Sequence, residues 1–103
     1  MNSNNEIIRP SGFAILPAPV RYDKRLSFDE RVLFGEITAL CAGKYYCLVS
    51  DDYFAELYET DEATISRWID HLTELGYIRV GKRLINGRVI GLNINISYGE
   101  GEL

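Results

Sequence analysis

Residues 50–76 of this chain read SDDYFAELYETDEATISRWIDHLTELG, a pattern that predicts two amphipathic helices in succession. In the first helix, Phe54, Leu57 and Tyr58 have the i, i+3, i+4 spacing of one helical face. In the second, apolar side chains recur with helical spacing at Ile65, Trp68, Ile69, Leu72 and Leu75. Ala55 is small, so the second helix can cross the first closely at that point.

The ends of the second helix carry signals of their own. Asp61 stands just before the apolar stripe, where its carboxylate can accept from the free N–H groups of the first turn. Gly76 follows the stripe, and glycine adopts the left-handed backbone that ends many helices at little cost. Only Glu59 and Thr60 remain between the helices. So short a link forces a sharp crossing, which predicts a helix-turn-helix.

A β-hairpin is predicted to follow. Residues 77–80 form a strand candidate, residues 81–87 a loop, and residues 88–96 a second strand in which apolar residues alternate with asparagines. Asn86-Gly87 is a strong signal for a hairpin turn. A helix-turn-helix followed by a hairpin is a winged helix. The predicted fold class is therefore α+β, with three helices, a small antiparallel sheet and an extended N-terminal arm.

The remaining helix and strand are predicted upstream. Ser27 and Glu30 have the spacing of a capping box, which starts a helix that we expect to run to about Cys41. Its apolar face is formed by Leu33, Ile37 and Leu40, with Phe28 and Val32 beside it. Residues 43–49 lead into a short β-prone segment, which we expect to pair with the hairpin as a third strand.

The two ends of the chain look different from its centre. Residues 1–12 are polar and are predicted to form a disordered arm. Residues 13–20 read FAILPAPV, and their prolines exclude the interior of a helix, so we expect an extended segment packed on the domain. The predicted domain spans residues 13–96, and residues 97–103 are expected to be a frayed tail.

Several of these segments together resemble a known family. Residues 61–69 (DEATISRWI) and 72–78 (LTELGYI) look like the winged-helix DNA-binding pattern of many bacterial and phage proteins. Residues 13–17 (FAILP) and 33–40 (LFGEITAL) narrow the resemblance to the N-terminal domain of phage replisome organisers and related replication initiators, a group close to the DnaD-like primosome proteins. The resemblance implies a protein that binds duplex DNA at an origin and recruits helicase-loading or primosome partners in a bacterial host cell.

The chain departs from this family pattern at two places. The turn position that often holds glycine holds Glu59, where a left-handed backbone would cost about 1 kcal/mol. The second helix opens with Asp61 and Glu62, where many relatives are neutral or basic. Both departures weaken the groove contact expected of an isolated domain, so binding as a dimer or a larger assembly stays open.

Composition bounds the kind of protein. With 103 residues, 47 % hydrophobic and 25 % charged, the chain fits one folded domain. No stretch approaches the roughly 20 apolar residues of a membrane span, and the polar start lacks the pattern of a signal peptide, so we expect a cytoplasmic protein. Cys41 and Cys47 are interpreted as buried thiols, and together with His71 they are too few for a metal site.

Charge is unevenly distributed along the chain. The net charge of −4 is unusual for a DNA-binding domain, which is usually basic. Residues 29–62 include nine acidic and two basic residues. Residues 79–88 include no acidic residue and four basic ones: Arg79, Lys82, Arg83 and Arg88. Lys82, Arg83 and Arg88 flank the hairpin turn and can neutralise phosphates in or beside the minor groove. The plainer alternative is a solvated hairpin.

The outward side chains at the start of the second helix are the other DNA-contact candidates, because such a helix fits the major groove. Arg67 can pair with guanine or with phosphate, and Thr64 and Ser66 can bond phosphates or bases. Ala63 can touch a thymine methyl group. Glu62 can accept from cytosine but repels phosphate.

Three residues of this helix have plainer interpretations. Arg67 can form an ordinary surface ion pair with Asp70 or Glu74. Trp68 lies on the apolar stripe and is expected in the core rather than against a base. His71 has no partner at ligand spacing and is expected to be a partly exposed surface histidine.

The sequence lacks the motifs of an enzyme. It has no glycine-rich phosphate loop, no carboxylates paired with histidine for a metal, and no nucleophile with a base, so neither catalysis nor a cofactor is expected. The main hypothesis is the double-stranded DNA-binding domain of a phage- or plasmid-type replication initiator. A winged-helix transcriptional regulator is one alternative. A protein–protein interaction module, with residues 13–20 as a homo-oligomer contact, is the other.

Overall fold

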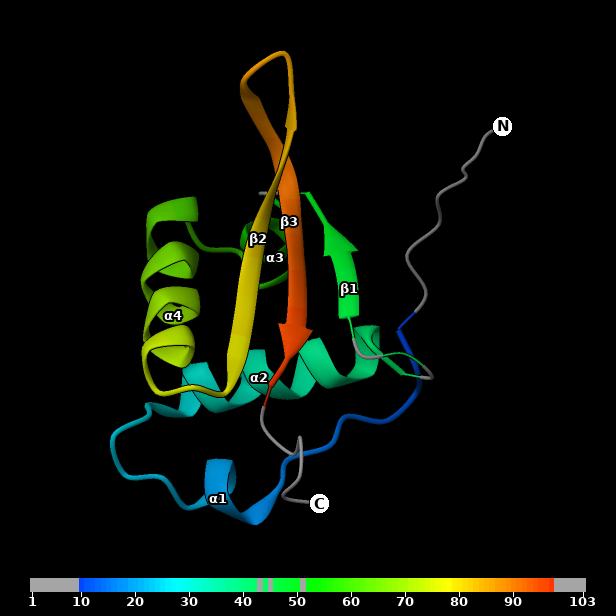
Figure 1. The fold of residues 1–103 in the computed structure, drawn as a ribbon. Helices are drawn as coiled ribbons and strands as arrows, with labels where there is room; N and C mark the ends of the chain where they lie inside the picture. The colour runs from blue at the N-terminus through cyan, green and yellow to red at the C-terminus, as the bar shows by residue number, and fades with distance from the viewer. Residues whose placement is uncertain (1–9, 43, 45, 51, 98–103) are drawn as a thin grey trace.

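The computed structural model describes residues 10–42, 44, 46–50 and 52–97, and residues 83, 85 and 88–90 are described by their backbone only. Within this part of the chain the helices and strands are α1 (Ala18–Arg21), α2 (Phe28–Leu40), β1 (Tyr46–Val49), α3 (Tyr53–Leu57), α4 (Glu62–Glu74), β2 (Ile78–Ile85) and β3 (Arg88–Ile96). Figure 1 shows the strands as an upright sheet, with α4 beside it and α2 across its lower end. The predicted α+β winged helix-turn-helix is confirmed.

The start of α2 is set by the capping box expected from its sequence. The Ser27 hydroxyl oxygen accepts from the Glu30 N–H (3.1 Å), and a Glu30 carboxylate oxygen accepts from the Ser27 N–H (2.8 Å). These reciprocal bonds satisfy two backbone donors that would otherwise lack partners at the helix end.

The buried face of α2 is rotated from the predicted one. Leu33, Phe34 and Ile37 are fully buried, whereas Phe28 and Val32 are 80 % and 55 % exposed. The prediction that these last two lie beside the apolar face was wrong. Phe34 lies on the buried side with Leu33 and Ile37, so Phe28 and Val32 turn to the opposite side of the helix.

The sheet is antiparallel in the order β1-β3-β2, and β1 is the predicted third strand. In β1 the side chains alternate, with Cys47 and Val49 buried and their neighbours exposed. One face of the sheet therefore packs on the helices. Cys41 and Cys47 are both buried and free, as predicted, and the contact between their thiols together with burial raises the pKa of Cys47.

The hairpin β2–β3 is longer than predicted. Residues 81–85, expected in a loop, continue β2 up to the pair Ile85↔Arg88. Asn86 and Gly87 alone make the turn, with φ of 53° and 76°. These left-handed angles give a turn whose twist matches that of the flanking strands, so the ladder runs up to the turn. We call residues 83–91, which extend beyond the last β1–β3 pair at Leu92, the wing.

The turn between α3 and α4 is as short as predicted. Glu59 has a left-handed backbone (φ 55°), and the Thr60 N–H donates to the Ala55 carbonyl (3.0 Å), which satisfies a carbonyl at the end of α3. Gly76 ends α4 in the same conformation (φ 86°). The prediction that Leu57 belongs to the buried face of α3 was wrong, because this side chain is 46 % exposed.

The segment before α2 differs in part from the extended arm that was expected. Residues 18–21 form the one-turn helix α1, which begins directly after Pro17 and has proline in its first turn. Proline is tolerated there because the first N–H groups of a helix have no partner within it. Val20 is fully buried, so α1 belongs to the core.

The residues before α1 lie along α2. The Ile15 N–H donates to the Thr38 hydroxyl (2.7 Å), and the Ser11 N–H donates to the Ala39 carbonyl (3.0 Å). Ser11, within the predicted disordered arm 1–12, therefore contacts α2 near its end, and residues 1–9 lie outside the described part. Ser97, the first residue of the predicted tail, donates to the Tyr77 carbonyl (3.1 Å), and residues 98–103 also lie outside it.

The Asp23 carboxylate links the connection between α1 and α2 to the residue just before β2. The Tyr77 hydroxyl donates to Asp23 (2.7 Å), whose carboxylate also accepts from both Nε and Nη2 of Arg25. The Arg25 bonds, and then that of Tyr77, hold the pKa of Asp23 well below its usual range. These bonds fix the connection between α1 and α2 against the start of β2.

Candidate nucleic-acid interface

The N-terminal end of α4 is fixed by a side-chain cap. Asp61 Oδ1 accepts from the Thr64 N–H (2.8 Å), as its position in the sequence predicted. The bonds from Thr64 lower the pKa of Asp61. A negative charge here also interacts favourably with the helix dipole. The same charge stands at the end of α4 that would approach DNA.

The opposite end of α4 is held by a contact that the sequence did not reveal. His71 Nδ1 lies 2.7 Å from Glu30 Oε2, while the other oxygen of Glu30 belongs to the α2 capping box. The His71 side chain is 33 % exposed, as expected of a partly exposed histidine, but it has a specific partner. The Glu30 carboxylate thus ties the start of α2 to the last turns of α4 and fixes the direction of α4.

Most of the predicted contact residues on α4 face outward. Glu62, Ala63, Ser66 and Arg67 are exposed, while Thr64 is half-buried. The opposite face packs inward through Ile65, Ile69 and Leu72, with Trp68 and Leu75 partly buried against the core. The predicted apolar stripe and the core position of Trp68 are therefore confirmed.

Thr64 and Arg67 adjoin a depression on the α2 side of α4. Its lining also includes Val32, Tyr58 and Trp68. No hydrogen bond or ion pair joins Arg67 to another residue within the described part, so the ordinary surface pair with Asp70 or Glu74 is not formed there. Arg67 is exposed, and its charge interacts electrostatically with the carboxylate of Asp61.

The wing carries the second set of predicted contact residues. Figure 1 shows the hairpin extending beyond the N-terminal end of α4. Lys82 is exposed at the base of the wing, and Arg83 and Arg88 lie within it, paired with Gly91 and Ile85. The side chains of Arg83 and Arg88 lie outside the described residues. A register shift follows Arg83, which bends the strand at this point.

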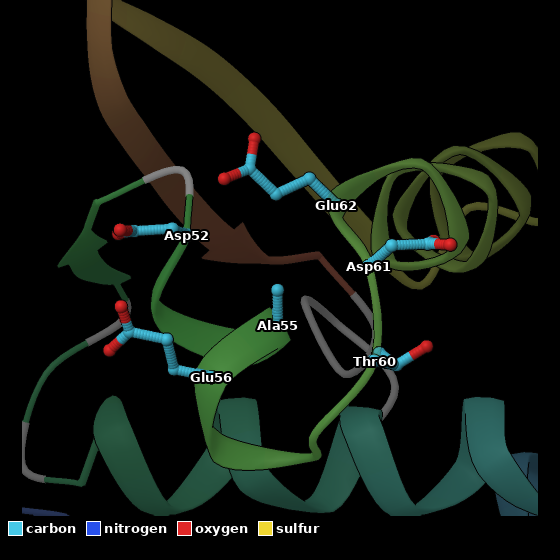
Figure 2. A pocket seen from close by; sticks show the side chains of 6 residues that line it. All are labelled: Asp52, Ala55, Glu56, Thr60, Asp61 and Glu62. Carbon is cyan, nitrogen blue, oxygen red and sulfur yellow. The ribbon is translucent and has the colours of Figure 1, made fainter.

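An acidic depression separates the start of α4 from α3, and the sequence did not predict that its residues converge. It is lined by Asp52, Ala55, Glu56, Thr60, Asp61 and Glu62. Figure 2 shows Ala55 near its centre, with Asp52 and Glu56 from the α3 side and Glu62 from α4 around it. Within the described residues no cluster of His, Cys, Asp or Glu side chains is arranged to hold a metal ion.

Comparison with known proteins identifies the family. A profile described as "Helix-turn-helix domain" matches residues 24–78, from just before α2 to the start of β2. No curated protein and no solved structure matches the chain. In the described residues, no helix is long and apolar enough to cross a membrane. The matched segment is more than half of the 103 residues and contains α3, the turn at Glu59 and α4, so the chain belongs to the helix-turn-helix domain family, whose fold points to DNA binding.

Proposed function

We propose that this protein binds double-stranded DNA through the outward face of α4 and the wing, as the DNA-binding domain of a phage- or plasmid-type replication initiator. The observation that carries DNA binding is the exposed Arg67 on a helix that stands beside a basic hairpin. The replication role rests on the resemblance of residues 13–17 and 33–40, together with the winged-helix pattern of residues 61–69 and 72–78, to replisome organisers. It is a binding role, in which the protein places partners on DNA and catalyses no reaction.

A salt series measures this proposal directly. Fluorescence anisotropy with a labelled random duplex should show binding that weakens with salt, at a log–log slope of about −3 to −4, as expected for about four neutralised phosphates. Absence of binding even at low salt would exclude duplex DNA as a direct ligand of the domain.

An interaction module is the second candidate, and the segment before α1 favours it. Phe13 and Ile15 are 85 % and 63 % exposed, although the backbone at Ile15 is bonded to α2. In the same segment Leu16 is partly buried and Val20 is fully buried within the chain, so Phe13 and Ile15 are its exposed large apolar side chains. Light scattering that finds only a monomer would exclude a homo-oligomer through residues 13–20.

The replication-initiator hypothesis and the transcriptional-regulator hypothesis differ in the DNA sites that they require. A transcriptional regulator with this fold needs an operator palindrome and a dimer, whereas an initiator needs repeated sites within an origin. The helix-turn-helix geometry is common to both.

A further inference from the structure

We propose that the wing, rather than the N-terminal end of α4, makes the dominant contact with duplex DNA, and that the acidic depression weakens the docking of α4. This inference rests on the proposed function. It differs from the usual winged-helix arrangement, in which the recognition helix makes the main DNA contact and the wing makes a secondary one. It follows from where the charges lie in the folded chain.

The first step concerns the end of α4. A recognition helix meets base edges with its N-terminal residues, and the phosphates of both strands then lie close to that end. Here that end carries Asp61, whose carboxylate caps the helix, and Glu62, and both residues are exposed. Asp52 and Glu56 border the same depression. Phosphates brought to this end of α4 therefore lie near carboxylates as well as near Arg67.

The second step concerns the wing. Its backbone extends beyond the three-stranded part of the sheet, since the last β1–β3 pair is Val49↔Leu92. Lys82, Arg83 and Arg88 lie at the base of the wing or within it, and residues 79–88 include no acid. Figure 1 shows the hairpin extending beyond the N-terminal end of α4, so a duplex can contact the wing without docking α4 in its groove. Since phosphate contact supplies most of the affinity of such domains, the wing should supply most of it here.

The third step predicts a measurable asymmetry. Replacing Glu56 and Glu62 by glutamine removes two carboxylates near the path of the phosphates. Two like charges about 7 Å apart in water repel enough to change an equilibrium about two- to threefold, before screening by salt. The variant Glu56→Gln/Glu62→Gln should therefore bind a random duplex about fivefold more tightly at low salt.

A matched control separates a local effect from the change in net charge. Asp70→Asn/Glu74→Gln removes the same charge from exposed positions in the second half of α4, neither of which lines the depression. It should change affinity less than twofold. Arg67→Ala should also weaken binding less than about threefold, because α4 is not the main contact.

The anisotropy titration of these variants, together with the wild-type protein, tests the inference. Tighter binding by the depression variant alone, with a small loss for Arg67→Ala, supports it. Equal effects of the depression variant and its control, or a loss above tenfold for Arg67→Ala, would overturn it and leave DNA binding intact. A wild-type protein that binds no duplex would overturn the proposed function itself.

Discussion

Replacement of Gly91 by alanine should destabilise the protein by about 2 kcal/mol, which for a domain of this size lowers Tm by about 10 °C. A Cβ atom at this position would lie 2.6 Å from the carbonyl oxygen of Val49 and 3.4 Å from its carbonyl carbon. The neighbouring atoms belong to the backbone of β1, so no side chain can rotate away to make room. β1 must instead move from β3.

The consequence of that movement extends beyond the sheet edge. Val49 is the last residue of β1, is 2 % exposed and belongs to the core cluster. Displacing Val49 disturbs the packing against α2. It also weakens the pairing of β1 with β3 next to the wing. Gly81→Ala is the matched control, because no heavy atom lies within 4 Å of a Cβ at that position. Thermal unfolding of both variants measures the difference, and a Gly91→Ala protein as stable as Gly81→Ala would contradict the close approach of β1.

Loss of the wing charges should have the largest effect on DNA affinity. The double variant Lys82→Ala/Arg83→Ala should weaken binding to a random duplex more than tenfold at about 0.1 M salt, because each lost phosphate contact removes nearly one unit of the log–log salt slope. The slope should become shallower by about 2. Lys82 is exposed and Arg83 lies within the wing, so the variant should keep the stability of the wild-type protein.

The control for this double variant removes the same number of positive charges at positions outside the wing. Lys24→Ala/Lys44→Ala removes two exposed bases, one between α1 and α2 and the other just before β1. Anisotropy across the salt series should show an unchanged slope for this control. Equal slopes for the two double variants would show that the wing makes no particular contact with phosphate.

Local signals in the sequence predicted the ends of the elements well. The cap bonds at Ser27 and Asp61, and the left-handed turns at Gly76 and Asn86-Gly87, involve only residues within a few positions of one another. The backbone of such short segments is restricted by its own residue types, so spacing alone is informative. Glu59 is the exception, because the turn imposes a left-handed backbone that its residue type disfavours.

Contacts between distant segments could not be predicted in this way. His71 bonds Glu30 across 41 positions, and Tyr77 bonds Asp23 across 54. Neither spacing nor residue type indicates such pairs. The exposed Phe28 has the same cause: helical periodicity shows that a face is apolar, but the neighbouring elements decide which face is covered.

The candidate interface combines both situations. The sequence showed an acidic segment and a basic hairpin, but not that Asp52, Glu56 and Glu62 border one depression at the start of α4. That convergence depends on the sharp turn at Glu59 and on the crossing of α3 and α4. Together with the basic hairpin, this convergence of carboxylates predicts that the wing, rather than α4, makes the main contact with DNA.

Amide chemical shifts measured during titration of the ¹⁵N-labelled protein with a short duplex test the central claim most directly, because they locate the contact as well as detect it. The largest changes should fall in residues 82–91, with smaller ones in residues 62–67. Changes confined to residues 11–16, or none at all, would contradict a wing-led contact with DNA and would favour the interaction module instead.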